Sequence, residues 1–136
     1  MGFSMVSLAV YRRSKDVKDN KILMRGKWGS DQREFHLTAQ LSEAPDALRF
    51  TRPLDSGGQS GFDKLTAQGQ NLSLSLLAIE GVWRITVMTY SVTVEKGVAF
   101  IWEDILLRAT QAVREVFPEH LRESVQFIDE VISAEK

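Results

Sequence analysis

The chain has 136 residues, of which 43% are apolar and 26% are charged, and its formal net charge is −1. This balance is typical of a soluble globular domain and excludes a disordered chain, a collagen-like chain and a coiled-coil rod. The absence of cysteine excludes a disulfide framework, a thiolate zinc site and a cysteine nucleophile. No apolar run approaches the roughly 18 residues of a membrane span. We therefore expect one domain over residues 1–136.

The first residues give no targeting signal. Met1 to Val6 lack a basic start followed by a long apolar stretch, so a secretory signal is not predicted. Gly2 would fit a myristoylation motif, but Val6 stands where that motif requires Ser or Thr. These observations favour a cytoplasmic protein.

Residues 4–96 are predicted to be rich in strands. Apolar and polar residues alternate over 5–11 and 21–27, and most clearly over 34–41, where Phe35, Leu37, Ala39 and Leu41 share one face. Residues 28–31 are predicted to form a turn, and Leu48 and Phe50 to begin a short strand. The alternating segments fit half-buried strands.

The middle of the chain contains a predicted loop and further strands. Residues 53–61 include three glycines and two serines, which is typical of an exposed, flexible loop. Residues 62–68 fit a short helix or the returning side of that loop. Leu72, Leu74 and Leu76 alternate with Ser73 and Ser75 and predict a strand. A longer strand is expected over 83–94, where the apolar phase reverses between Val87 and Met88. The reversal indicates either a bulge at that point or a strand that is covered on both faces.

From residue 98 the apolar spacing becomes helical. We expect helices over 98–117 and 119–134, separated by Pro118, which fits the first position of the second helix. The predicted fold class is α+β: an antiparallel sheet of six or seven strands, with one or two C-terminal helices packed on it. In element order alone this resembles the pleckstrin-homology architecture, so a meander or a curled sheet of that kind is expected.

Motifs that carry chemistry are scarce. His36 and His120 lack a paired metal-ligand spacing, so we predict no metal site. The glycines near Ser60 match neither the nucleophile elbow nor a phosphate-binding loop. The carboxylate pairs Glu103-Asp104 and Asp129-Glu130 would point apart on a helix. We therefore predict a non-catalytic domain without a cofactor, and an enzyme is the less favoured reading.

Charge is distributed unevenly along the chain. Residues 12–33 contain eight basic and three acidic residues, whereas residues 71–136 contain six basic and ten acidic ones. A basic N-terminal hairpin that contacts an anionic partner is one interpretation. Its predicted binding residues are Arg12, Arg13, Lys15, Lys18, Lys21, Arg25, Lys27 and Trp28. The alternatives are an exposed hairpin protected from edge pairing, and head-to-tail contact with the acidic helices of a second copy.

Two further surfaces remain open. The predicted second helix could present a protein interface, formed by Leu121, Val125, Phe127, Ile128 and Ile132. A pocket between sheet and C-terminal helix could be lined by Trp83, Met88, Tyr90 and Trp102. The sequence thus favours a self-associating binding or adaptor module whose anionic partner is an acidic protein surface, a nucleic acid or an anionic membrane. A small-ligand-binding or enzymatic domain with that pocket is the alternative.

Overall fold

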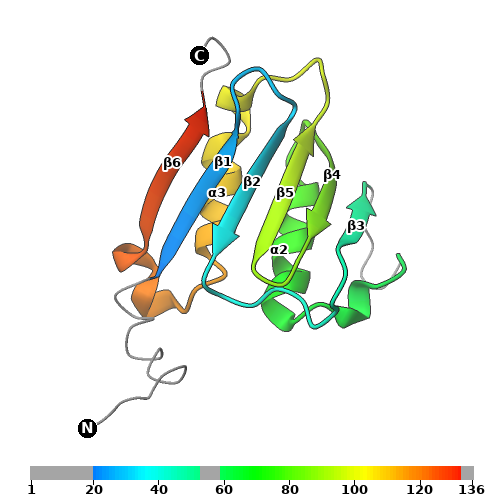
Figure 1. Ribbon diagram of the computed structural model, residues 1–136, viewed down its shortest axis with the longest axis vertical. Coiled ribbons are helices and arrows are strands. Elements are labelled where there is room, and N and C mark those ends of the chain that lie inside the picture. Colours follow the sequence, from blue (N-terminus) through cyan, green and yellow to red (C-terminus); the bar gives the residue numbers. More distant parts are fainter. Residues whose placement is uncertain (1–19, 53–58, 133–136) are drawn as a thin grey trace, which may run out of the picture.

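A single sheet with helices on one face forms the described part of the chain (Figure 1). The computed structural model describes residues 20–52 and 59–132. Its strands are β1 (Lys21–Lys27), β2 (Gln32–Leu37), β3 (Leu48–Thr51), β4 (Val82–Val87), β5 (Ser91–Lys96) and β6 (Gln126–Ile132). Its helices are η1 (Phe62–Lys64), α2 (Ala67–Leu77), η2 (Trp102–Asp104), α3 (Leu106–Arg114) and η3 (Glu119–Ser124), where η denotes a 3-10 helix.

The sheet is mixed. Its strand order is β3-β4-β5-β2-β1-β6, and all neighbours are antiparallel except β1 and β6, which pair in parallel. The α+β class and the six strands are confirmed, but the expectation of a purely antiparallel sheet was wrong. The chain leaves β5, returns along α3 behind the sheet and then enters β6, so β6 runs in the direction of β1 (Figure 1).

Helix α2 occupies the segment that was expected to be a strand at Leu72, Leu74 and Leu76. The helix begins after Thr66, whose side chain accepts the N–H of Gly69. Leu72 and Leu76 are buried one helical turn apart, so the same leucines satisfy a helix as well as a strand. Gly69 packs closely on the backbone of the segment that follows β2. A Cβ at Gly69 would overlap the carbonyl oxygen of Leu41. The helices are therefore not confined to the C-terminal part.

The long strand expected over residues 83–94 is a hairpin. Strands β4 and β5 are joined by a tight turn in which Met88 N–H donates to the carbonyl of Ser91. The phase reversal after Val87 comes from this turn, and the register irregularity lies instead between Val82 and Arg84. That irregularity rotates Trp83 outward, so its side chain is exposed.

The C-terminal part also differs from expectation. Within the first predicted helix, 98–117, η2 and α3 form only the central portion. The second predicted helix, 119–134, was wrong, because η3 is followed by β6. Residues 125–132 are rich in valine and isoleucine, which favour extended backbone, and β6 gains a full ladder with β1 in register from Lys21 opposite Gln126 to Lys27 opposite Ile132.

Other segments were placed correctly or lie outside the described residues. β1, β3 and the turn at 28–31 are confirmed, and β2 shows the expected inward alternation at Phe35 and Leu37. The expected strand over 5–11 and residues 53–58 of the loop expected over 53–61 lie outside the described ranges.

At both outermost strands, β3 and β6, a side chain forms a hydrogen bond with backbone groups that face away from the rest of the sheet. On β6, Asp129 Oδ1 accepts the N–H of Val131 at 3.0 Å. On β3, the Gln59 carboxamide accepts the N–H of Thr51 at 3.0 Å and donates to its carbonyl at 2.6 Å. These bonds occupy edge groups that an additional strand would otherwise use.

The hydrophobic core lies between the sheet and the two α-helices. Its fully buried residues come from strands and helices alike: Ile22, Phe35, Phe50, Ile85, Leu76, Ile105 and Val113. The opposite surface of the sheet, which we call the open face, is in front in Figure 1 and is covered by neither α2 nor α3. Among the described residues, no helix is long and apolar enough to cross a membrane.

Candidate functional site

The turn between β1 and β2 meets the segment that follows β5 at one end of the sheet. A cavity of about 310 Å³, which we call the turn pocket, lies between them. It is lined by Trp28, Gly29, Ser30, Arg33, Lys96, Phe100, Ile101, Trp102 and Glu103. Two cations, three aromatic rings and one carboxylate thus converge from segments that are distant in sequence.

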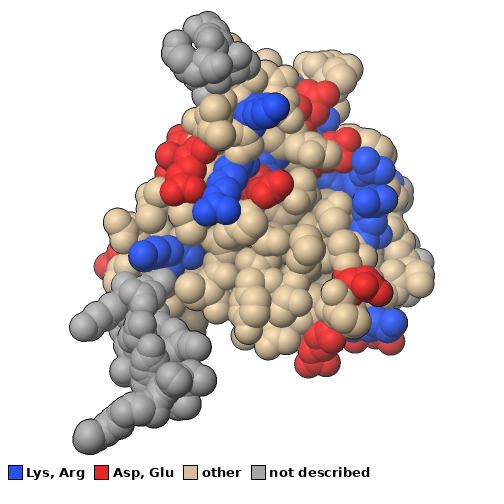
Figure 2. Space-filling view, viewed as in Figure 1, with Lys and Arg blue, Asp and Glu red and all other residues tan. Residues whose placement is uncertain are grey.

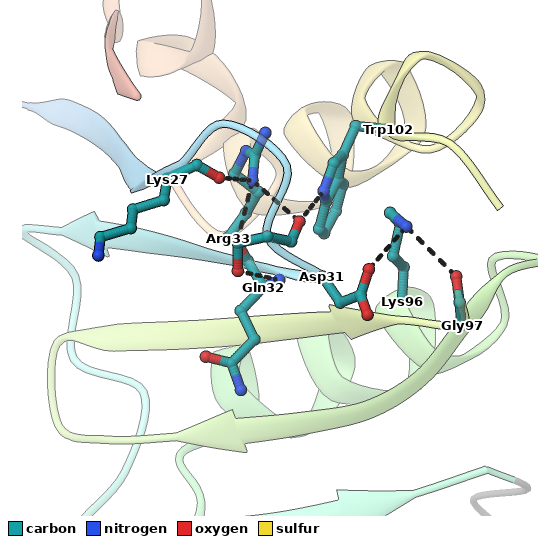
Figure 3. A network of polar contacts seen from close by, with 8 residues as sticks. Lys27, Asp31, Gln32, Arg33, Lys96, Gly97 and Trp102 are labelled. Carbon is teal, nitrogen blue, oxygen red and sulfur yellow. Dashed lines mark hydrogen bonds and ion pairs between the residues drawn. The ribbon is translucent and has the colours of Figure 1, made fainter. Parts of the chain in front are cut away.

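Arg33 is the buried cation of the turn pocket. It belongs to β2 and is only 5% exposed. Its Nη1 donates to the carbonyls of Lys27 at 3.1 Å, Gln32 at 3.1 Å and Ser30 at 3.4 Å (Figure 3). Its Nε is buried and finds no hydrogen-bond partner in residues 20–52 and 59–132. The guanidinium therefore fixes the β1–β2 turn and still has an unused donor.

Space for this side chain comes from Gly26 in β1. A Cβ at Gly26 would lie 3.0 Å from the Gln32 carbonyl oxygen and 3.1 Å from Arg33 Cδ, which is tighter than ordinary contact. A larger residue would therefore push the arginine or the turn out of place.

Trp102 lies between the two cations of the pocket (Figure 3). Its Nε1 donates to the Ser30 carbonyl at 2.8 Å. The Arg33 Cζ is 4.8 Å from the ring centroid, and the Lys96 Nζ is 6.0 Å from it. Each cation is therefore within the range of attraction to the indole face, and η2 is tied to the β1–β2 turn.

Lys96 ends β5 and is almost as buried as Arg33. Its Nζ donates to Asp31 Oδ1 at 2.9 Å and to the Gly97 carbonyl at 3.4 Å. An ammonium group has three N–H donors, so these bonds leave one that no described residue accepts.

The electrostatics of Arg33 are unusual for a buried charge. Burial lowers the pKa of Arg33 below its ordinary value, and the nearby carboxylate of Asp129 partly offsets this effect. A guanidinium nevertheless stays protonated at neutral pH. No carboxylate of the described residues forms an ion pair with it, and buried charges are normally paired. The pocket therefore has, at Arg33, a positive charge without a direct counterion in the described part of the chain.

A second cavity of about 430 Å³ adjoins the turn pocket on the side of β6. It shares Trp28, Arg33, Trp102 and Glu103 with the turn pocket and adds Met24, Leu106, Asp129 and Val131. Arg33 shares this cavity with two acidic residues, whereas the turn pocket is lined by Arg33, Lys96 and one acidic residue. Because Lys96 is paired with Asp31, Arg33 is the cation of the turn pocket that lacks an ion-pair partner among the described residues.

The predicted basic residues divide between two surfaces and the undescribed part. Arg12, Arg13, Lys15 and Lys18 lie outside the described residues. Lys21, Arg25 and Lys27 lie on the open face of β1, where Arg25 pairs with Glu130 at 3.0 Å. Figure 2 shows Lys and Arg on this face interspersed with Asp and Glu. Trp28, in contrast, lines the turn pocket.

The other predicted sites are not brought together as a unit. Trp83, Met88 and Tyr90 are exposed, while Trp102 is buried beside the turn pocket. Of the expected C-terminal interface, Val125 is buried and Phe127 packs against the core. Leu121 lies in η3, and Ile128 and Ile132 lie on the open face of β6, since they occupy register positions opposite Leu23 and Lys27.

Arg33 and Lys96 were not singled out from the sequence, although a signal for both exists. Arg33 is in phase with Phe35 and Leu37, and Lys96 is in phase with Val92 and Val94. A cation that continues the apolar side of a strand is expected to face the core. Reading each charged residue against its strand phase would have separated these two from the exposed ones.

Metal ligands are not gathered in the described part of the chain, where no cluster of three or more His, Asp or Glu residues could hold an ion. His36 contacts Glu34 at 2.9 Å on β2, and His120 is exposed in η3.

Comparisons with known proteins support the fold. No family model matches the sequence, and no curated protein matches it. Among solved structures, the crystal structure of protein SAV1430 from Staphylococcus aureus is similar, with a TM-score of 0.51 and 20% sequence identity. The similarity covers 68% of this chain and 98% of that one. At this identity the likeness shows a shared fold alone.

Proposed function

We propose that this domain is a non-catalytic binding module that holds an anionic group of a partner in the turn pocket. The observation that carries the proposal is the buried guanidinium of Arg33, which has no direct carboxylate partner among the described residues. Removing a charge from water is costly unless another charge or a set of hydrogen bonds compensates it. An anion in the pocket would supply the missing counterion.

The composition of the pocket favours binding over catalysis. Among the described residues its lining contains one carboxylate and no histidine, and its lysine is held by Asp31, so neither paired acids nor a histidine base is gathered there. It does offer a small number of charged groups in an aromatic wall, which is the usual makeup of a recognition pocket.

A larger groove of about 550 Å³ between α2 and α3 is the competing location. The groove has one cation, Arg122, and one acid, Glu115. Arg122 donates hydrogen bonds to the carbonyls of Phe117 and Glu115, and Glu115 is exposed to water. The turn pocket is favoured because the charge of Arg33 is buried and has no direct counterion within residues 20–52 and 59–132.

The proposal is tested by titrating ¹⁵N-labelled protein with acetate and with inorganic phosphate. We expect saturable shifts confined to residues 28–33 and 96–103, including the Trp102 indole N–H. Arg33→Met and Lys96→Met should each abolish these shifts, and two variants are used because either one could unfold. Arg49→Met, which removes an exposed arginine on β3, is the matched control and should change nothing.

Two results would count against this site. Shifts centred on Lys21, Arg25 and Lys27 that vanish in Lys27→Glu would place anion binding on the open face of β1, as the charge pattern of the sequence predicts. The absence of any saturable shift with either anion would overturn the proposed function.

A further inference from the structure

We infer that the partner is a protein segment that presents a single carboxylate next to a large apolar side chain. This inference rests on the proposed function, because it names the kind of molecule that carries the anion. Its basis is the combination of exposed apolar residues and buried cations in one small cavity.

The outer part of the turn pocket is apolar and exposed. Trp28 is 64% exposed, Ile101 54% and Phe100 36%, and all three line the cavity that contains Arg33 and Lys96. Large apolar residues gathered at one place on a surface mark interaction sites, and aromatic residues are the usual anchors of protein interfaces. A bare anion would leave this apolar rim in water.

Nearby acidic groups limit how much negative charge a partner can bring. Glu103 lines the turn pocket, and Asp129 joins it in the adjoining cavity. A nucleic acid or an anionic membrane would place several negative charges against these carboxylates. On the open face, Arg25 and Arg84 are paired with Glu130 and Glu95, so among the described residues these two arginines do not add unpaired positive charge beside the pocket. One carboxylate meets the cations with less of this repulsion than several negative charges would.

The size and rigidity of the pocket fit side chains of a protein partner. About 310 Å³ is at the lower end of the range for small-molecule sites, and it suits one or two side chains better than a large cofactor. The β1–β2 turn is held by Arg33, and Trp28 N–H donates to the Ile132 carbonyl at 2.7 Å. A preformed pocket of this kind loses little conformational entropy when a segment binds.

The test compares the acetylated, amidated dipeptide Trp-Asp with Trp-Asn, Ala-Asp and a ten-residue oligothymidylate, each titrated by NMR. We expect a dissociation constant for Trp-Asp at least about tenfold lower than for either control peptide, which is about 1.4 kcal/mol. The combined variant Trp28→Ala/Ile101→Ala should reduce the advantage of Trp-Asp over Ala-Asp to less than about threefold. Leu107→Ala, an exposed apolar residue on α3, is the matched control and should preserve it.

Failures of the two proposals differ. If Trp-Asp and Ala-Asp bind equally well and both still need Arg33, the apolar rim is unused, and this inference is wrong while the anion site stands. Tighter Arg33-dependent binding of the oligonucleotide would identify a nucleic-acid partner and also overturn the inference. If none of the peptides, acetate or phosphate binds in an Arg33-dependent way, the proposed function itself fails.

Discussion

The guanidinium of Arg33 stacks on the indole of Trp102, with 4.8 Å between Cζ and the ring centroid, while both side chains donate to the carbonyl of Ser30. Arg33 comes from β2 and Trp102 from η2, which are nearly 70 residues apart. This shared acceptor ties the helical layer to the β1–β2 turn. The candidate site and the end of the fold therefore depend on the same contacts.

Replacing Trp102 with phenylalanine tests this tie. Trp102→Phe removes the hydrogen bond to Ser30 and part of the buried ring, so we expect a loss of about 1–3 kcal/mol in the free energy of unfolding. Urea denaturation gives the value. Trp83→Phe is the control, because Trp83 is exposed and a change below about 0.5 kcal/mol is expected. Equal losses in the two variants would mean that the Trp102 contacts contribute little.

The glycine in α2 gives an independent test of the packing. Gly69→Ala should destabilise the domain by about 3 kcal/mol or more, because the added Cβ overlaps the Leu41 carbonyl. Helix propensity alone predicts the opposite sign, a gain of about 1 kcal/mol. Ser75→Ala, at an exposed position of the same helix, should change stability by less than about 0.5 kcal/mol. A stabilising Gly69→Ala would contradict the close approach of α2 to residue 41.

The pH dependence of anion binding in the turn pocket should follow the protonation of the ligand. The Arg33 guanidinium stays charged throughout the acidic and neutral range, even though burial lowers its pKa. Binding of phenylacetate should therefore be constant near neutral pH and fall as the pH drops through the carboxylate's own pKa of about 4. For phenyl phosphate the decline should begin near its second pKa of about 6. Titrations at several pH values check this, and an affinity that is unchanged once the ligand has lost its charge would exclude an anion-selective pocket.

Charge reversal on β1 separates the two cationic surfaces. We expect Arg25→Glu/Lys27→Glu to leave the affinity of the turn pocket for acetate within about twofold, because both side chains lie on the open face. The measurement is the same titration at low and at physiological salt. A larger, salt-sensitive loss would favour the strand surface predicted from the charge distribution, with Lys21 as its third described member.

The alternation of apolar and polar residues predicted much of the sheet. It failed where the same apolar residues fit both the two-residue period of a strand and the spacing of a helix. Phe35 and Leu37 alternate with polar residues, and β2 forms where they stand. Leu72 and Leu76 also alternate, but their separation equals one helical turn, and Thr66 caps a helix. The valines and isoleucines of 125–132 fit helical spacing, yet their β-branched side chains and the free edge of β1 select a strand. Such choices depend on partners that lie elsewhere in the chain.

The site was harder to predict than the fold, for a similar reason. Counting charges along residues 12–33 groups Arg33 with Lys27, although neighbouring strand phases send the two side chains to opposite faces of the sheet. Lys96 joins Arg33 only through the pairing of β2 with β5 and the return of η2 over the turn. Of the four predicted anion-binding residues that the structure describes, Trp28 alone lines the turn pocket.

The side chains of Asp129 and Gln59 have a consequence for how the domain behaves at high concentration. Strand β6 is rich in valine and isoleucine, a composition that promotes fibril formation when an edge is open. An incoming strand would first have to displace Asp129 from Val131 at one side, or Gln59 from Thr51 at the other. Sideways growth of the sheet into an aggregate therefore has to break a side-chain hydrogen bond at either edge before a new ladder can form.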